Sequence, residues 1–555
     1  MAVMIVADVH SRANFGESRV RHIELDLAVS FSARRLHGTA TLVLEPAGGR
    51  LVLDTRDLLI RSVNGRTDNF RLGDRDPILG APLEITLEPG ARSVVIEYET
   101  SPEASGLQWL EPGQTAGKRH PLLYSQSQAI HARSWIPLQD TPAVRATFSA
   151  RIHAPAPLRT LMAARRVRDG HFHMPWPVPS YLMALAVGDL EFRALSPRCG
   201  VWAEPPVLDK AAREFADVEK MVQAAEALYG PYRWGRYDIL VLPPSAPFGG
   251  MENPCLTFVT PTVIAGDGSL VSLIAHELAH SWSGNLVTNA TWNDFWLNEG
   301  FTTYIERRIQ EALYGRARSE MEMAVEVEEL EEELRRMPEA DQKLVLDLAG
   351  RDPDEGLTQV PYIKGALLLR HLEETLGRER WDAWLRGYFD KFAFRSITTE
   401  DFAAELRRAF PQLDLAAWLH RPGLPADAPR VQYQFEIEPR PGWATQEWLH
   451  WLRSLPDRMP PDEMAALDRR WKLTETGNSE IAAQWLLMAV RNRYEAAWGR
   501  LERFLAEVGR RKYVKPLYEE LARTPEGLER ARKIYEKARP GYHPITRAAV
   551  DALLE

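Results

Sequence analysis

The sequence predicts a multidomain α+β protein, with an N-terminal antiparallel β domain, a mostly helical middle domain and a C-terminal all-α, solenoid-like domain. Alternating apolar and polar residues dominate the first third, helical spacing replaces them near residue 190, and a proline-rich stretch precedes a last helical part. A chain of 555 residues is long enough for three or four domains. We therefore expect domains at residues 1–190, 191–425 and 443–555, with residues 426–442 as a linker.

The first domain is expected to be a β sandwich or saddle. Ile23, Leu25 and Leu27 alternate with polar residues, which is the period of a strand with one buried face. The same alternation returns, with turn residues between, in four further segments: 39–46, 50–55, 83–88 and 93–100. No long helical period interrupts the region, which favours an antiparallel β domain.

Helical spacing organises the two domains that follow. Residues 209–230 carry apolar side chains three and four apart and end at Gly230, where a glycine commonly closes a helix. Residues 236–244 are typical of a strand ended by prolines, and helices dominate from there to about residue 420. Beyond the linker, amphipathic segments such as 479–509 predict the solenoid-like domain.

Composition limits the classes of partner. The net charge is −9, so no basic surface points to a nucleic acid. No apolar run reaches the roughly 18 residues of a membrane helix. Two cysteines, Cys199 and Cys255, make no disulfide framework and fit a reducing compartment. We expect a cytoplasmic monomer that binds neither nucleic acid nor membranes.

The segment His276-Glu277-x-x-His280 carries the strongest chemical signal. Ser269 can cap a helix that runs to about Trp282, and residues four apart lie on one face of such a helix. Two imidazoles can then bind one zinc ion, while Glu277 projects beside them as a general base. The alternative interpretation is an amphipathic helix with two surface histidines that bind nothing.

Glu299 is the expected third ligand. Eighteen residues separate it from His280, and it begins a second helix that packs on the first through apolar residues such as Trp296 and Ile305. Two histidines and one glutamate with an open fourth position form a catalytic rather than a structural zinc set. We expect one Zn²⁺ per chain, and Glu306 could hydrogen-bond a ligand from behind.

Four further segments carry a family resemblance. GGMENPCLTFVTPT, HELAHSWSGNLVTN, FWLNEG and VPYIKG together resemble the gluzincin aminopeptidases, and within them the leukotriene-A(4) hydrolase and aminopeptidase B subfamily. The resemblance extends over nearly the whole chain and implies a thermolysin-like catalytic domain. It also implies a zinc aminopeptidase that acts on short peptides. The alternative is a lipid epoxide hydrolase using the same zinc; a non-catalytic peptide-binding protein is disfavoured because ligands, base and tyrosine are all present.

The resemblance also assigns roles at the amine end of a substrate. Glu252 and Gln128 would hold the free amino group, which is what distinguishes an exopeptidase. The loop of Gly249, Gly250 and Met251 would pair with the peptide backbone, because side chains on the glycines would block its approach.

Other roles follow from the same resemblance. Tyr362 would donate a hydrogen bond to the oxyanion. Asp354 would lie at the substrate end and favour an N-terminal arginine, while Arg510 and Lys512 would bind the terminal carboxylate of the peptide. Ordinary surface charge is the alternative for Asp354 and for the basic pair.

Two positions depart from the family pattern. Phe248 and Leu357 stand where the vertebrate hydrolase has tyrosines that line the pocket. Peptide cleavage requires neither phenol, whereas the shaped apolar cavity of an epoxide hydrolase depends on such positions.

Overall fold

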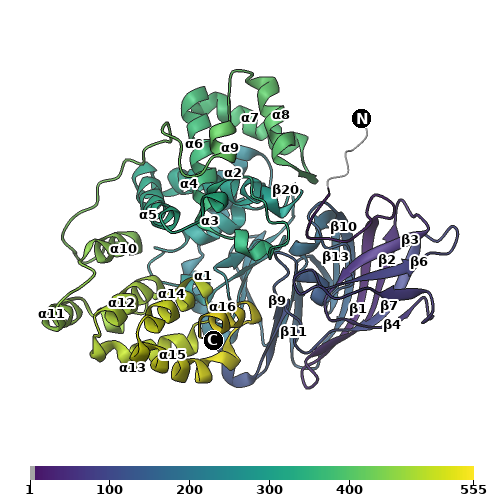
Figure 1. Cartoon of the computed structure of the whole chain (residues 1–555), viewed down its shortest axis with the longest axis horizontal. Helices are drawn as coiled ribbons and strands as arrows, with labels where there is room; N and C mark the ends of the chain where they lie inside the picture. The colour runs from purple at the N-terminus through teal and green to yellow at the C-terminus, as the bar shows by residue number, and fades with distance from the viewer. Residues whose placement is uncertain (1–6, 555) are drawn as a thin grey trace.

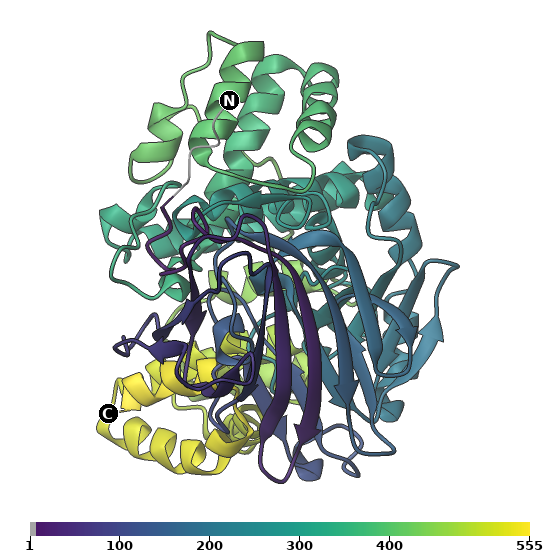
Figure 2. The ribbon, with the colours of Figure 1, turned by 90° about the vertical axis from the view of Figure 1, so that its right-hand side faces the viewer.

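The computed structural model describes residues 7–554, so the first six residues of the predicted β domain lie outside the described residues. The β domain lies beside the other two domains, with the helices of the middle domain above those of the C-terminal domain (Figures 1 and 2). Three-domain architecture is therefore confirmed, while the boundaries at residues 190, 425 and 442 stay predictions. Within residues 7–554, no helix combines the length and apolarity that a membrane span requires.

The β domain contains three sheets in the described residues, ordered β12-β13-β10-β1-β2-β7-β4, β11-β14-β9-β8 and β3-β6-β5. Their strands are β1 (Val20–Ser30), β2 (Arg35–Leu44), β3 (Arg50–Thr55), β4 (Leu59–Val63), β5 (Phe70–Leu72), β6 (Ala81–Thr86), β7 (Ser93–Glu99), β8 (Leu107–Leu110), β9 (Leu122–Ser125), β10 (Arg145–His153), β11 (Arg159–Met162), β12 (Arg165–Arg168), β13 (His171–Pro179) and β14 (Leu185–Gly188). Each of the predicted strand segments overlaps one of these strands.

One pairing departs from the antiparallel expectation. Ile23 on β1 lies opposite Leu42 on antiparallel β2, but opposite Phe148 on parallel β10. Alternation of apolar residues determines which face of a strand is buried and says nothing about the direction of its neighbour. Ile23, Leu25 and Leu27 are all buried, so the predicted face is confirmed.

The middle domain combines a mixed sheet, ordered β15-β16-β17-β19-β18, with a helical body. The strands of the mixed sheet are β15 (Glu191–Ala194), β16 (Cys199–Ala203), β17 (Tyr237–Val241), β18 (Gly250–Met251) and β19 (Leu256–Val259). A separate two-stranded sheet is formed by β20 (Val287–Asn289) and β21 (Arg395–Ile397). Its helices are α1 (Pro205–Glu214), α2 (Val218–Tyr229), α3 (Ser272–Ala279), α4 (Trp296–Tyr314), α5 (Arg316–Leu334), α6 (Gly365–Leu376), α7 (Arg378–Lys391), α8 (Thr399–Ala409) and α9 (Ala416–His420).

Two helices differ from their predicted extents. The segment 209–230 is split between α1 and α2, and the chain bends between them so that Phe215 and Val218 are both buried. Helix α3 is shorter than predicted, because Ser269 does not cap it; its hydroxyl instead pairs with Thr445 Oγ1 of the C-terminal domain at 2.7 Å. Gly230 does close α2, with φ of +95°.

A close helix contact positions the functional residues of the middle domain. A Cβ atom on Gly300 of α4 would lie 2.8 Å from Gly365 Cα of α6, so only glycine allows these backbones to approach. Glu299 precedes one of these glycines, and Tyr362 lies three residues before the other. The contact therefore brings both side chains to the same region.

The C-terminal domain is all helical in its described part, with α10 (Thr445–Ser454), α11 (Pro461–Trp471), α12 (Ser479–Arg491), α13 (Trp498–Glu507), α14 (Arg511–Ala522), α15 (Pro525–Ala538) and α16 (Pro544–Leu554). The predicted segment 479–509 comprises α12 and α13 with a short break. Residues 421–444, all described, form the long connection from α9 to α10 without helix or strand (Figure 1). This domain has its own apolar core, whereas the β and middle domains share one continuous core.

Candidate active site

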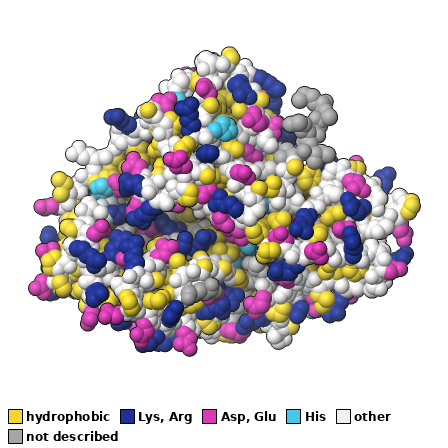
Figure 3. Space-filling view, in the orientation of Figure 1, with side chains coloured by type: hydrophobic (Ala, Val, Ile, Leu, Met, Phe, Trp, Pro, Cys, Tyr) yellow, Lys and Arg dark blue, Asp and Glu magenta, His cyan; other side chains and the backbone are white. Residues whose placement is uncertain are grey.

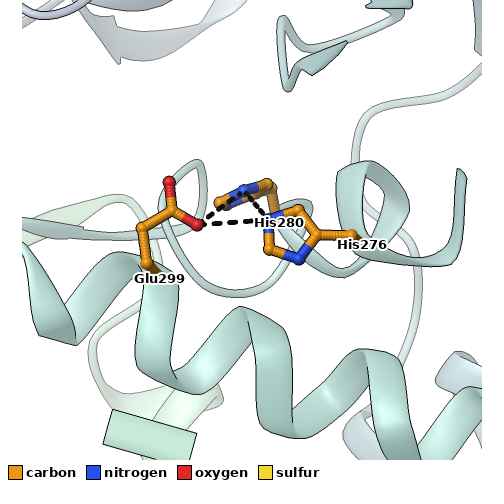
Figure 4. A group of neighbouring side chains, drawn as sticks. All are labelled: His276, His280 and Glu299. Atoms are coloured by element: carbon orange, nitrogen blue, oxygen red, sulfur yellow. Dashed lines mark hydrogen bonds and ion pairs between the residues drawn. The ribbon is translucent and has the colours of Figure 1, made fainter. Parts of the chain in front are cut away.

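Two histidines and a glutamate meet beside α3. His276 lies on α3, His280 follows at its end, and Glu299 projects from the first turn of α4 (Figure 4). The two imidazole Nε2 atoms are 3.2 Å apart, and Glu299 Oε2 lies 3.1 Å from His276 Nε2 and 3.5 Å from His280 Nε2. A tetrahedral zinc ion with bonds of about 2.0–2.2 Å separates its ligand atoms by about 3.3–3.6 Å. The three side chains therefore fit one zinc ion and leave its fourth position open.

The outer hydrogen bonds determine which imidazole nitrogen faces this point. His276 Nδ1 lies 3.0 Å from Glu306 Oε2, and because a carboxylate accepts, Nδ1 donates. His280 Nδ1 lies 3.0 Å from the carbonyl oxygen of Ser283 and donates to it in the same way. The Nε2 lone pairs of both histidines and the carboxylate of Glu299 then face one another. These electron-rich groups repel each other unless a cation lies among them. The sequence indicated Glu306 but not Ser283. Every residue type has a backbone carbonyl, so the sequence does not reveal which one accepts this hydrogen bond.

Glu277 lies beside the metal point and is 4% exposed. Its Oε2 atom has no hydrogen-bond partner among the described residues. Burial raises the pKa of Glu277 to about 8, although the two neighbouring imidazoles act in the opposite direction. A divalent cation at the metal point would lower that pKa. The carboxylate is therefore free to accept a proton from a group that enters the site.

Neighbouring side chains leave no room for a side chain at Gly249 or Gly250. A Cβ atom on Gly250 would lie 2.2 Å from Glu277 Oε1, and one on Gly249 would lie 2.7 Å from a terminal nitrogen of Arg510. Such distances are too short for non-bonded atoms, so any larger residue would displace a functional side chain. This reason adds to the backbone approach that the family resemblance implies.

A cavity of about 1000 Å³ extends from the metal point and is lined by residues of all three domains. All predicted site residues line it except Met251 and Asp354. Phe248 and Leu357, the two departures from the family pattern, also line it. Met251 is buried, and its sulfur accepts a hydrogen bond from Gln126 Nε2 at 3.3 Å. Met251 contributes its backbone to the edge strand β18, whereas its side chain does not line the cavity.

Two buried polar groups that line the cavity lack hydrogen-bond partners among the described residues. Glu252 is 3% exposed and Gln128 is 8% exposed, yet Glu252 Oε1 and Gln128 Nε2 have no hydrogen-bond partner among residues 7–554. Burial raises the pKa of Glu252. Asn285 Nδ2 holds the carbonyl oxygen of Glu252 at 2.7 Å and so fixes the backbone of this residue. Buried atoms left without partners cost free energy, which a ligand with complementary groups would recover.

Tyr362 is held against the metal ligands. It lies in a single π-helical turn, Val360–Lys364, that runs directly into α6. Its ring stacks on that of His276 with the centroids 6.0 Å apart, and Phe295 packs against its edge. The phenol is therefore close enough to the metal point to reach a substrate atom bound there.

Arg510 and Lys512 share a carboxylate that sequence reasoning missed. Glu480 Oε1 on α12 lies 3.2 Å from Lys512 Nζ and 3.6 Å from Arg510. Burial alone would raise the pKa of Glu480, but the two cations outweigh it and lower that pKa to about 2. Arg510 also donates to Tyr513 Oη at 2.7 Å and to Thr262 Oγ1 at 3.1 Å. The basic pair is thus fixed in place, with part of its charge already neutralised.

Asp354 is engaged by the β domain. Its Oδ1 accepts the N–H of Ala129 at 3.3 Å, and its Oδ2 lies 3.2 Å from His131 Nε2. Burial alone would raise the pKa of Asp354. The hydrogen bond and charge of His131, together with the Ala129 N–H and the charge of Arg511, outweigh burial and keep that pKa low. The structure therefore brings Asp354 to the loop that carries Gln128, with its two carboxylate oxygens engaged by Ala129 and His131 and its side chain 13% exposed.

Comparisons with known proteins agree with this geometry. The chain matches the Peptidase M1 N-terminal domain at residues 19–182, the Peptidase family M1 domain at residues 214–420 and the leukotriene A4 hydrolase C-terminal domain at residues 443–554. It is 38% identical to a leukotriene A-4 hydrolase of Xenopus laevis over 98% of both chains. It is 36% identical to leucine aminopeptidase 2 of Yarrowia lipolytica over 99% of this chain and 93% of the relative.

Solved structures give the same result. The fold superposes on yeast LTA4 hydrolase in complex with bestatin with a TM-score of 0.92 and 32% identity, covering 100% of this chain and 98% of that one. An M1 zinc metallopeptidase from Deinococcus radiodurans covers 77% of this chain with all of its own length, at a TM-score of 0.59 and 25% identity.

The fold and the two-histidine, one-glutamate centre define the class as a zinc metallopeptidase. The chain belongs to peptidase family M1, in the branch that carries a leukotriene A4 hydrolase C-terminal domain. It is accordingly a zinc-dependent aminopeptidase, with one catalytic zinc as its cofactor.

Proposed function

We propose that this enzyme removes the N-terminal residue of short peptides whose amino group binds Glu252 and Gln128. The observation that supports it most is the pair of buried atoms, Glu252 Oε1 and Gln128 Nε2, which line the cavity and have no hydrogen-bond partner within residues 7–554. A positively charged α-amine is the partner that a buried carboxylate favours. An amine bound at that point places the first peptide bond beside the metal centre.

His276, His280 and Glu299 are the proposed zinc ligands, and Glu306 orients His276. Zinc bound there would act as a Lewis acid on the scissile carbonyl and make water acidic near neutral pH. The remaining steps belong to side chains of this protein.

Glu277 is the proposed general base. It takes a proton from the attacking water and transfers it to the leaving amine, a role that typically contributes about 10²–10⁴-fold in rate. Tyr362 donates a hydrogen bond to the substrate oxygen as negative charge develops on it. The stacking of Tyr362 on His276 holds the phenol in place for this bond.

Arg510 and Lys512 are proposed to bind the terminal carboxylate of the peptide at the far end of the cavity. Both line the cavity, and Arg510 contacts the glycine loop. Their fixed position favours substrates whose two ends are a few residues apart. A cavity bounded by three domains also disfavours long folded chains.

Matched tripeptides test the amine assignment. We expect Leu-Ala-Ala to be hydrolysed and its N-acetylated form to be a poor substrate, because acetylation removes the charge that Glu252 binds. Glu252→Gln should reduce kcat/KM for the free peptide. Equal cleavage of both peptides by the wild-type enzyme would contradict the assignment, and a parallel assay with a chelator establishes metal dependence.

Epoxide hydrolysis is the second candidate, suggested by the name of the Xenopus relative and by its match over 98% of this chain. Phe248 and Leu357 line the cavity and change its polarity at two family positions. A direct assay of a lipid epoxide, with Leu-Ala-Ala as the reference substrate, separates the two activities. A rate with the epoxide comparable to that with the peptide would support the second candidate.

A cytoplasmic location, a monomeric state and the lack of nucleic-acid partners are parts of the same proposal. Their support is the composition of the chain: a net charge of −9 and two free, buried cysteines. Light scattering of the purified protein would test the monomeric state directly.

A further inference from the structure

One turn of the chain contacts both the metal site and the proposed amine site. It comprises residues 283–286, between α3 and β20. At its start, the carbonyl oxygen of Ser283 accepts a hydrogen bond from His280 Nδ1 at 3.0 Å. Farther along, the Nδ2 atom of Asn285 donates to the carbonyl oxygen of Glu252 at 2.7 Å. The position of the 283–286 turn therefore affects a proposed zinc ligand and the proposed amine anchor together.

The β domain holds this turn through Arg145 on β10. Its Nη2 atom donates to the carbonyl oxygen of Asn285 at 2.7 Å, and its Nη1 atom donates to Thr288 Oγ1. The hydroxyl group of Thr288 donates in turn to the carbonyl oxygen of Gly284 at 2.5 Å, so this second contact also reaches the turn. Tyr181 donates to the same carbonyl oxygen at 3.2 Å. Because Arg145 does not line the cavity, its effect on a substrate passes through the turn.

Arg145 is a buried cation whose partners are all neutral. It is 7% exposed, and its third donor, Nε, binds the carbonyl oxygen of Pro177 at 3.0 Å. The Lys and Arg side chains visible in Figure 3 lie on the surface, where water solvates their charge. Every other buried arginine among residues 7–554 lies within 3.6 Å of a carboxylate oxygen: Arg133, Arg307, Arg308 and Arg510. Burial of an unpaired charge costs free energy, so charge pairing does not explain Arg145. The rigid planar fork of a guanidinium fixes the spacing of its acceptors, which favours a positional role.

The metal end of the turn has further support from the middle domain. The hydroxyl group of Ser283 is shared between the carbonyl oxygens of Leu297, at 2.9 Å, and Asn298, at 3.0 Å, both on α4. Thr302 Oγ1, also on α4, lies 3.0 Å from His280 Nδ1. Loss of Arg145 should therefore leave the zinc ligands in place.

The amine end of the turn depends on fewer contacts. Asn285 Oδ1 has no hydrogen-bond partner in the described part of the chain, so this side chain is oriented by its bond to Glu252 and by its own backbone. Arg145 holds that backbone at the carbonyl oxygen. Asn285 is 1% exposed, so removal of Arg145 would leave a buried carbonyl oxygen without this donor. A resulting shift of Asn285 would displace Glu252.

We propose that Arg145 is a positioning residue for the amine site: through Asn285 it holds Glu252 where the carboxylate meets the free α-amine of a substrate. The inference rests on the proposed function, because it takes Glu252 as the partner of that amine. The β domain then shapes the amine site by two routes, directly with Gln128 and through the turn with Arg145. Loss of Arg145 should weaken amine binding while zinc stays bound.

Two ligands with the same carbon skeleton separate amine binding from chemistry. L-Leucine is a product of Leu-Ala-Ala hydrolysis, and 4-methylpentanoate is leucine without its amino group. Calorimetry on the zinc-loaded enzyme gives both dissociation constants, and metal analysis gives the zinc content of each protein. We expect the wild type to bind leucine more tightly than 4-methylpentanoate. In Arg145→Met, the Kd of leucine should rise about tenfold, that of 4-methylpentanoate should not change, and zinc should stay at one per chain.

Further variants identify the route of the effect. Arg145→Lys should retain part of the leucine affinity, because an ammonium group can still donate to one of the two acceptors. Asn285→Ala removes the bond to Glu252, so it should weaken leucine binding to a similar extent, and adding Arg145→Met to it should cause little further loss. Arg151→Met is the matched control: it makes the same substitution on β10 at an exposed residue paired with Asp26, and both Kd values should equal those of the wild type.

The outcomes are distinct. Unchanged leucine affinity in Arg145→Met, an equal loss for both ligands, or a loss of zinc would overturn the role of Arg145. Additive effects of Arg145→Met and Asn285→Ala would overturn the route through the turn. Arg145→Lys and Asn285→Ala give the answer if Arg145→Met does not fold. Equal wild-type affinity for leucine and 4-methylpentanoate would instead contradict the amine site of the proposed function.

Discussion

The metal end and the far end of the cavity are built in different ways. His276, His280 and Glu299 come from two consecutive helices of one domain, packed in a core that the β domain shares. Arg510 and Lys512 belong to a separate domain with its own core. The difference teaches that the proposed reacting groups are positioned by local packing, whereas the position of the pair proposed to bind the peptide carboxylate depends on how two domains meet.

Ion pairs cross the contact between the middle and C-terminal domains, whose apolar cores are separate. Glu329 on α5 pairs with Arg453 on α10 at 2.7 Å, and Glu328 pairs with His450 at 2.9 Å. Ion pairs of this kind contribute little and are weakened by salt, unlike the apolar core that joins the other two domains. We therefore expect substitutions at the metal end to abolish peptide hydrolysis, and substitutions at the far end to change the relative rates with different substrates.

Removal of a metal ligand should have the largest effect. Glu299→Ala leaves two imidazoles, which are too few to hold zinc tightly, so activity should fall below detection together with the zinc content. Metal analysis of the purified variant checks this, with Glu311→Ala as the control, because Glu311 lies about three turns further along the same helix and pairs with Arg378. Full zinc occupancy in Glu299→Ala would remove this residue from the ligand set.

Substitution of the base should separate binding from chemistry. Glu277→Gln keeps all three ligands, so zinc should stay at one per chain while kcat falls by about 10²–10⁴-fold. Paired measurements of metal content and turnover distinguish it from Glu299→Ala. Wild-type turnover in Glu277→Gln would end the assignment of the general base.

The metal end could be predicted from the sequence because its spacing reflects helix geometry. Two histidines four residues apart must lie on one face, and the apolar residues around Glu299 place its helix against the first. Helix boundaries were less accurate: the cap predicted at Ser269 fails because that hydroxyl binds a residue 176 positions away. No local pattern reports such a partner.

The far end shows the limit of sequence reasoning. Resemblance identified Arg510 and Lys512, but the carboxylate between them, Glu480, lies on another helix and has no pattern of its own. The family resemblance also pointed to Asp354, yet His131 of the β domain engages it. Charge alone does not reveal whether a side chain is free, because pairing across domains is decided by tertiary contacts.

Loss of an outer hydrogen bond should have an intermediate effect. Glu306→Gln weakens the bond that orients His276, so zinc affinity should fall by about 10–100-fold. Competition with a chelator measures the affinity, and activity should return when excess zinc is added. An unchanged affinity would mean that packing alone orients the imidazole.

The smallest effect should appear at the far end and should depend on the substrate. Lys512→Met removes one cation of the basic pair while Glu480 still holds Arg510, so KM for Leu-Ala-Ala should rise by about fivefold, the size expected for a half-exposed charged contact. The kinetics of leucyl p-nitroanilide should not change, because that substrate has no terminal carboxylate. Lys515→Met is the matched control, since Lys515 lines the same cavity on the same helix and is paired with Glu519. An equal change with both substrates would show that Lys512 stabilises the domain interface rather than the peptide, and the contrast between the two ends of the cavity would then lose its functional meaning.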